Sequence, residues 1–125
     1  MYIHNRCRIL PIYSDYMIYS NNVPVFRNDQ GNLLDEFIEA SFITSPAVNR
    51  TFAKFMMSGK KINRIMERGI IKILSVAMKE DPEVIVLGAF GCGVFGNNRE
   101  VILPMFEAAI NKYIPENIKV VFAIV

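Results

Sequence analysis

The glycine-rich segment Gly88 to Asn97 is the part of the sequence whose residue types and spacing are best suited to chemistry. Four glycines fall within nine residues, between an apolar run and a helical pattern. Glycine lets the backbone adopt a positive φ and approach a ligand closely, and the start of the following helix presents unpaired N–H groups and the positive end of a dipole. The segment therefore predicts a loop that binds an anion, and a diphosphate is the first hypothesis.

The loop does not complete either of two known phosphate-binding patterns. The stretch from Gly91 to Gly96 matches G-x-G-x-x-G letter for letter, but a dinucleotide site also needs an acidic residue at the end of the next strand. The last residues are Phe122-Ala-Ile-Val125, and Glu116 precedes that strand. A P-loop needs Lys followed by Ser or Thr, which do not follow Gly96. A purely structural turn needs one or two glycines, so four glycines favour a ligand.

Other reactive side chains give weaker signals. Cys92 lies near a predicted helix N-terminus, which acidifies thiols, but the one histidine, His4, is far away in the sequence and is expected to be exposed. The acidic residues Asp35, Glu36 and Glu39 are interpreted as a solvated turn rather than a catalytic pair. We predict no catalytic residue, no metal site and no cofactor from these patterns.

Composition limits the classes of function. The chain of 125 residues is long enough for one domain, and its net charge of +2 comes from dispersed lysines and arginines, which argues against nucleic acid as a partner. No apolar run reaches the roughly 20 residues that span a bilayer, so no membrane partner is expected. Two cysteines, Cys7 and Cys92, are typical of reduced thiols, and a cytoplasmic location is predicted. The hydrophobic share of 52% suggests that some apolar surface stays uncovered.

The elements that must position the loop follow from periodicity and turn signals. Apolar residues recur three and four positions apart after Ser58, which predicts an amphipathic helix ended by Asp81-Pro82. Asn98 caps a second helix, which Pro104 either kinks or shortens to begin at Leu103. Two turns are predicted, at Ser20 to Asn22 and at Asn28 to Asn32. The predicted strands, in chain order, are Tyr16 to Tyr19, Val23 to Phe26, Phe37 to Ser45, Val84 to Leu87 and Ile118 to Val125. This order predicts an α/β core with two right-handed crossovers.

Several longer segments resemble one protein family, in the same order along the chain. They are Tyr13 to Ser20, Val23 to Arg27, Phe42 to Ala47, Leu87 to Asn97 and Val120 to Ile124. The sequence resembles the C-terminal part of the microbial-type poly(ADP-ribose) glycohydrolases, a branch of the macrodomain fold. The resemblance implies an incomplete macrodomain-like mixed sheet with flanking helices, and residues 1–125 as one domain that is N-terminally truncated relative to the family.

The resemblance also implies a ligand for the glycine loop. In the family, the matching loop wraps the diphosphate and the distal ribose of ADP-ribose, and the residue that matches Phe95 packs against that ribose. The implied binding residues are Ala89, Gly91, Cys92, Gly93, Val94, Phe95, Gly96 and Asn97. Phe90 is expected to be a core residue.

The resemblance leaves activity and assembly as separate questions. Family enzymes carry a Gly-Gly-Gly loop and a Gln-Glu-Glu motif whose second glutamate is the acid, and neither motif occurs in this sequence. A positioned proton donor contributes about 10²- to 10⁴-fold, so we expect recognition of ADP-ribose or poly(ADP-ribose) without hydrolysis by this chain alone. The alternatives are a hydrolase completed by oligomerisation or by a separate chain, and an inert truncated product. A homo-oligomer is expected, because Phe37 to Thr44 or Val84 to Leu87 should have an unpaired edge or an uncovered face.

Overall fold

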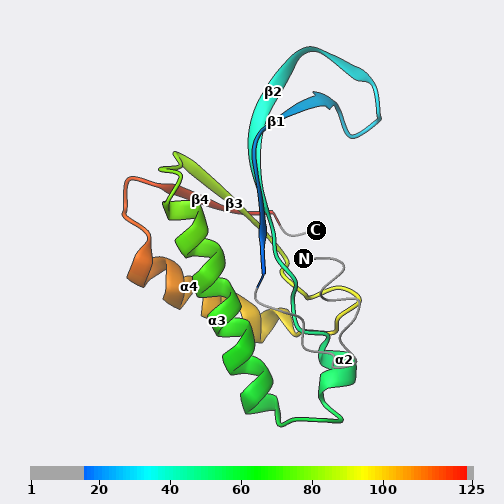
Figure 1. Cartoon of the computed structure of the whole chain (residues 1–125), viewed down its shortest axis with the longest axis vertical. Helices are drawn as coiled ribbons and strands as arrows, with labels where there is room; N and C mark the ends of the chain where they lie inside the picture. The colour runs from blue at the N-terminus through cyan, green and yellow to red at the C-terminus, as the bar shows by residue number, and fades with distance from the viewer. Residues whose placement is uncertain (1–15, 124–125) are drawn as a thin grey trace.

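The computed structural model describes residues 16–123, and the predictions for His4, Cys7 and the other residues of 1–15 and 124–125 lie outside that range. Figure 1 shows the described elements in their spatial arrangement. They are β1 (Ile18–Arg27), β2 (Leu33–Thr44), α2 (Arg50–Ala53), α3 (Gly59–Met78), β3 (Val84–Gly88), α4 (Arg99–Tyr113) and β4 (Lys119–Ala123). The mixed α/β class predicted from the sequence is confirmed, with two small sheets and flanking helices.

The strands form two separate two-stranded sheets in the described part of the chain. β1 pairs with β2 in an antiparallel hairpin, and β3 pairs with β4 in parallel. The crossover through α4 is therefore confirmed as a link between neighbouring parallel strands. The expected crossover from β2 to β3 does not link two strands of one sheet, because among the described residues β2 and β3 belong to separate two-stranded sheets.

The first hairpin differs from the prediction at Asn21 and Asn22. These residues lie inside β1 at an interruption of the register between Ser20 and Val23, and the hairpin turn is instead at residues 28–32. Asn22 has a φ of +48°, and its N–H donates to the Ser41 hydroxyl at 3.2 Å. The predicted turn at Ser20 to Asn22 is therefore wrong, because the segments on both sides of it pair with β2 and make Asn21 and Asn22 a β-bulge within one strand.

The two long helices form as their sequence patterns predict. The Ser58 side chain accepts from the N–H of Lys61 at the start of α3, and Asn98 accepts from the N–H of Glu100 at the start of α4. Pro104 lies inside α4, so the alternative in which this helix begins at Leu103 is wrong. The buried side chains of both helices join one core cluster, which includes Ile62, Met66, Ile70, Leu74, Ile102, Phe106 and Ala109. None of the described helices is long and apolar enough to cross a membrane.

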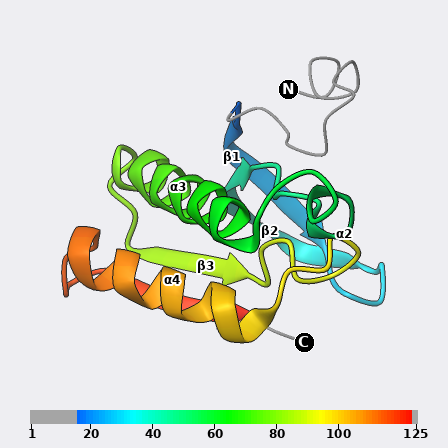
Figure 2. The ribbon, with the colours of Figure 1, turned by 90° about the horizontal axis from the view of Figure 1, so that it is seen from below.

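The β3–β4 sheet is covered on one face. Ile85 and Leu87 are buried in the helix core, and α3 and α4 run alongside β3 (Figure 2). The alternate residues Val84 and Val86 point to the opposite face, where their side chains are 50% and 65% exposed. Parallel sheets are normally buried on both faces. The expectation that Val84 to Leu87 has an uncovered apolar face is confirmed for the described residues.

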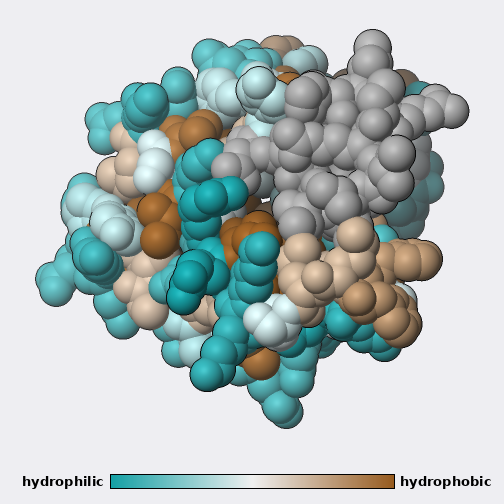
Figure 3. Space-filling view, turned by 60° about the horizontal axis from the view of Figure 1, so that its bottom comes forward, coloured by the Kyte–Doolittle hydropathy of each residue, from teal (hydrophilic) through white to brown (hydrophobic). Residues whose placement is uncertain are grey.

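A second exposed apolar surface lies around α2. Phe52, Phe55 and Met56 are all more than half exposed. In the space-filling view of Figure 3, a light-brown patch lies at the lower right, on the side of the molecule where Figure 2 places α2. The hydrophobic composition of the sequence is thus reflected in apolar side chains that the described fold leaves uncovered.

Candidate functional site

The glycine loop leaves the carboxyl end of β3 and leads into the N-terminus of α4. It lies beside α2 in both ribbon views (Figures 1 and 2). The backbone N–H groups of Arg50 and Thr51 donate to the carbonyl of Phe95 at 2.9 and 3.3 Å. The start of α2 therefore holds the far side of the loop at its backbone.

Asn97 fastens the loop to the segment that precedes α2. Its side chain is 4% exposed, and its Nδ2 donates to the carbonyl of Val48 at 2.9 Å and to that of Gly91 at 3.0 Å. Its backbone N–H also donates to the Gly91 carbonyl, at 3.2 Å. Because the amide nitrogen is used inside the protein, we infer that Asn97 positions the loop, and direct contact with a ligand stays a prediction.

Two of the loop glycines are required by the fold itself. Gly91 has a φ of +72°, and a Cβ there would lie 2.7 Å from both Ala47 Cβ and Asn97 Nδ2. Gly96 has a φ of +67°, and a Cβ there would lie 2.7 Å from Thr51 Oγ1. Backbone strain and close packing therefore explain these two glycines without any ligand.

Gly93 has no such explanation. Its φ is outside the left-handed region, and a Cβ would meet no atom within 4 Å. It is exposed at the tip of the loop beside Val94, which is 96% exposed. The N–H groups of Gly93 and Val94 donate to no backbone or side-chain acceptor in the described part of the chain. A small residue with two available donors is the arrangement expected where a phosphate approaches the backbone.

The aromatic residues of the loop differ in their surroundings. Phe90 is half-buried against the core and packs edge to face on Phe106, with ring centroids 6.4 Å apart, so it lies at the margin of the core rather than within it. Phe95 is half-buried against the core, while its carbonyl accepts from α2. Part of the Phe95 side chain thus stays accessible beside the loop, and its contact with a ribose remains a prediction. Ala89 is exposed at the beginning of the loop.

The Cys92 thiol is half-buried in the loop, and its contact with a ligand stays a prediction. Burial raises the pKa of its thiol, and the positive charge of Arg99 acts in the opposite direction with the smaller effect. The thiol also donates to the carbonyl of Phe90 at 3.6 Å. A raised pKa lowers the thiolate fraction at neutral pH, which agrees with the rejection of Cys92 as a nucleophile.

The acidic residues near the hairpin do not form a pair. Asp35, Glu36 and Glu39 lie within β2, so their predicted placement on a turn is wrong. Successive strand residues point to opposite faces, and Asp35 and Glu39, which share a face, are separated by about 13 Å along the strand. Glu100 is in the first turn of α4, where a carboxylate is stabilised by the helix dipole.

The segment from Val48 to Thr51, which contacts the glycine loop, was not predicted from the sequence. Val48, Asn49, Arg50 and Thr51 carry no motif, and the sequence marked only the end of a strand at Pro46. Their contribution is made mainly by backbone groups and by packing, which depend on distant residues meeting in space. The one available signal was the resemblance that covers Phe42 to Ala47.

Comparisons with known proteins identify the fold around this loop. No protein-family model and no curated protein matches the sequence. Solved structures match it closely: the poly(ADP-ribose) glycohydrolase from Deinococcus radiodurans in complex with ADP-ribose has a TM-score of 0.91 and 30% identity over 99% of this chain and 51% of that chain. The enzyme from Thermomonospora curvata has a TM-score of 0.86 and 38% identity, over 98% of this chain and 45% of that chain.

A further structure from Thermomonospora curvata, bound to the inhibitor ADP-HPD, has a TM-score of 0.85 and 35% identity. All three alignments include almost the whole of this sequence and about half of the solved relative. The described elements are similar in sequence and fold to a C-terminal portion of the bacterial poly(ADP-ribose) glycohydrolases.

Proposed function

We propose that this chain binds ADP-ribose, free or at the end of a poly(ADP-ribose) chain, and that the glycine loop receives the diphosphate. The observation that carries the proposal is Gly93, which no described atom crowds and whose N–H donates to no acceptor among the described residues. Relatives at 30% to 35% identity have been solved with ADP-ribose or ADP-HPD, which supports the same ligand class here.

The electrostatic surroundings of the loop favour an anion. The N-terminus of α4, a helix of 15 residues, directly follows the loop and contributes a positive partial charge. Arg99 lies close enough to Cys92 to affect the pKa of its thiol, so a full positive charge also lies beside the loop. In this proposal the backbone N–H groups of Gly93 and Val94 donate to phosphate oxygens, and the accessible part of Phe95 contacts the distal ribose.

Titration calorimetry tests the proposal directly. ADP-ribose should bind weakly but measurably, and adenosine, which lacks the diphosphate, should bind more weakly than ADP-ribose. Equal affinities for the two ligands would contradict a site built around phosphate.

We further propose that the chain by itself does not hydrolyse poly(ADP-ribose). The sequence contains no Gln-Glu-Glu motif, and Glu39 and Glu100 lie on a strand and at a helix start. Incubation with the polymer should release ADP-ribose at the buffer rate, with the Thermomonospora curvata enzyme as the positive control. Release well above that rate, abolished by Glu39→Ala or Glu100→Ala, would show that one of these carboxylates serves as the acid.

The isolated chain is also proposed to self-associate. Val84 and Val86 are at least half exposed on one sheet face, and Phe52 and Phe55 are exposed beside α2. Removing such surface from water contributes about 25 cal/mol per Å² of apolar area, and we expect this contribution to favour association. Light scattering should give a mass above that of the 14.3 kDa monomer. A single monomeric species at this concentration would contradict the expectation.

A further inference from the structure

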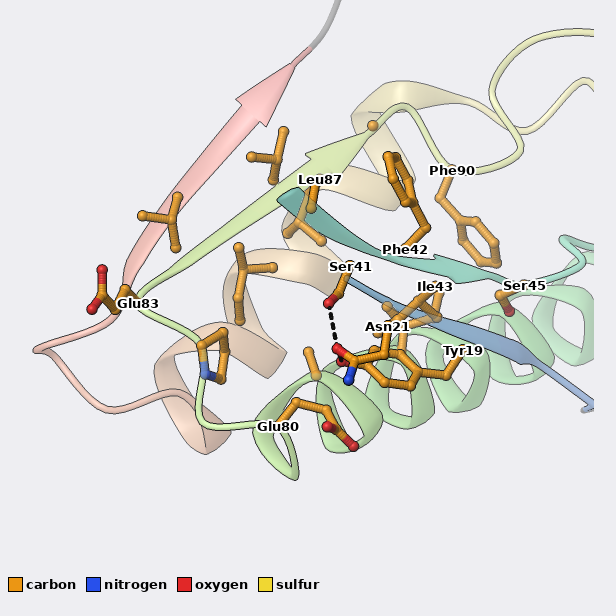
Figure 4. Close-up of a pocket in the computed structure, with 18 of the residues that line it drawn as sticks. Tyr19, Asn21, Ser41, Phe42, Ile43, Ser45, Glu80, Glu83, Leu87 and Phe90 are labelled. Atoms are coloured by element: carbon orange, nitrogen blue, oxygen red, sulfur yellow. Dashed lines mark hydrogen bonds between the residues drawn. The ribbon is translucent and has the colours of Figure 1, made fainter. Parts of the chain in front are cut away.

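The beginning of the glycine loop packs against one face of α3. The ring of Phe90 lines the cavity beside β3 and points from the loop toward α3 (Figure 4), where a Cβ added to Gly69 would lie 3.8 Å from Phe90 Cε1. Earlier in the same helix, Met66 is 1% exposed, and its Cε would lie 3.5 Å from a Cβ added to Gly91. The helix therefore approaches the loop at two consecutive residues.

The Met66 thioether also takes part in a buried hydrogen bond. The backbone N–H of Val48, a residue that is 4% exposed, donates to Met66 Sδ at 3.4 Å. Among the described residues, no backbone carbonyl accepts from this N–H. Sulfur is a weak acceptor, but a buried N–H without any acceptor is rare and costly. The placement of Val48 therefore depends on the sulfur atom.

Val48 connects Met66 with the glycine loop. Its carbonyl accepts from Asn97 Nδ2 at 2.9 Å, and the same nitrogen donates to the carbonyl of Gly91 at 3.0 Å. A series of hydrogen bonds thus leads from a side chain of α3 to the backbone of the loop, two residues before Gly93. Because protein interiors are closely packed, a shift of Val48 is transmitted to the loop through Asn97.

Apolar volume alone does not explain a methionine at this position of α3. The other buried residues of the helix are Ile62, Ile70 and Leu74, which lie four residues apart in the same stripe. Branched aliphatic side chains have fewer conformations than methionine and fix their neighbours better. Within this stripe, Met66 is the residue whose side chain carries a hydrogen-bond acceptor, and that acceptor is used.

We propose that Met66 is a positioning residue for the glycine loop, and that its sulfur atom acts through Val48 and Asn97. In this arrangement, the sulfur fixes where the N–H groups of Gly93 and Val94 point. The effect on affinity rests on the proposed binding of a diphosphate by these two groups. A loop that is held correctly in only a fraction of the molecules binds its ligand more weakly by that fraction.

Met66→Leu tests the role of the sulfur, because leucine keeps a similar apolar volume and the fold should remain. ADP-ribose should bind to this variant about three- to tenfold more weakly than to the parent, as the loss of one hydrogen bond predicts. Ile70→Leu alters an equally buried residue of α3, and Met78→Leu makes the same chemical change at a half-buried position of that helix. Both controls should bind as the parent does. Parent-like affinity of Met66→Leu, or equal losses in all three variants, would overturn the proposal.

Nuclear magnetic resonance without ligand provides a readout that a purely structural role of Met66 would not change. In Met66→Leu, the backbone N–H of Val48 should exchange with solvent at least about tenfold faster. The signals of the Asn97 side-chain amide and of the Gly93 N–H should shift, and all three groups should stay parent-like in Ile70→Leu. If Met66→Leu does not fold, the parent decides, because a Val48 N–H that exchanges as fast as the exposed N–H of Val94 has no acceptor and would overturn the proposal.

The two measurements separate this proposal from that of ligand binding. A parent protein that does not bind ADP-ribose would contradict the proposed function, while selective changes at Val48 and Asn97 in Met66→Leu would still support the positioning of the loop. Ligand binding by the parent, together with unchanged signals and unchanged affinity in Met66→Leu, would overturn the role of Met66 alone.

Discussion

Gly93→Asp should weaken ADP-ribose binding by more than tenfold while leaving the melting temperature almost unchanged. The added side chain meets no protein atom within 4 Å, so the fold has room for it. Its carboxylate would lie where the diphosphate is proposed to bind, and two like charges about 4 Å apart repel by roughly 1 to 4 kcal/mol near a protein surface. Each 1.4 kcal/mol corresponds to a factor of about ten in affinity. Calorimetry and a thermal melt measure the two effects on the same samples.

Two controls distinguish a local effect from a change in net charge. Gly93→Ala adds a methyl group without charge and should lower affinity less than the aspartate does. Ala108→Asp adds the same charge at an exposed position of α4. At 1.5 Å per residue it lies about 15 Å from Asn98, beyond the Debye length of about 8 Å at physiological salt. Unchanged binding by Gly93→Asp, or equal losses in Gly93→Asp and Ala108→Asp, would contradict a diphosphate at the loop tip.

Gly91→Ala should destabilise the protein by about 2 to 3 kcal/mol, whereas Gly93→Ala, two residues further on, should be nearly neutral. A residue other than glycine at positive φ costs about 1 to 2 kcal/mol, and the new methyl group would clash with Ala47 and with the buried amide of Asn97. Displacing Asn97 would also weaken its hydrogen bonds to Val48 and Gly91, each of which contributes about 1 kcal/mol. The strain and the lost contacts partly overlap, so the sum is not additive.

Thermal unfolding measures this difference between the two alanine variants. For a domain of this size, 1 kcal/mol corresponds to roughly 4 °C, so Gly91→Ala should melt about 10 °C below the parent protein. Melting temperatures that fall equally in the two variants would show that both glycines serve the fold. The ligand interpretation of Gly93 would then lose its main support.

Local patterns were sufficient to predict most of the secondary structure around the site. The three- and four-residue spacing after Ser58 predicted α3, whose side chains at those spacings are buried on one face. The short apolar run at Val84 predicted β3, and Asn98 predicted the start of α4. These features depend on residues within one or two turns of each other. The glycine loop between them was likewise predicted from adjacent residues, as a loop between a strand and a helix.

Tertiary structure decided what the individual residues of that loop do. The sequence treats Gly91, Gly93 and Gly96 alike, but Ala47 and Thr51, more than 40 residues away, leave no space at the first and third and none of the described atoms approaches the second. Asn97 was predicted as a ligand contact, which stays a prediction, and the hydrogen bond from its amide nitrogen to Val48 shows that it also supports the loop. Likewise, Asn21 and Asn22 form a bulge because Ser41 on β2 pairs with them.

The sequence by itself determined the elements and the loop, since those depend on neighbouring residues. Only the tertiary structure decided the roles within the loop and the division of the described strands into two sheets, because both depend on residues that are distant along the chain.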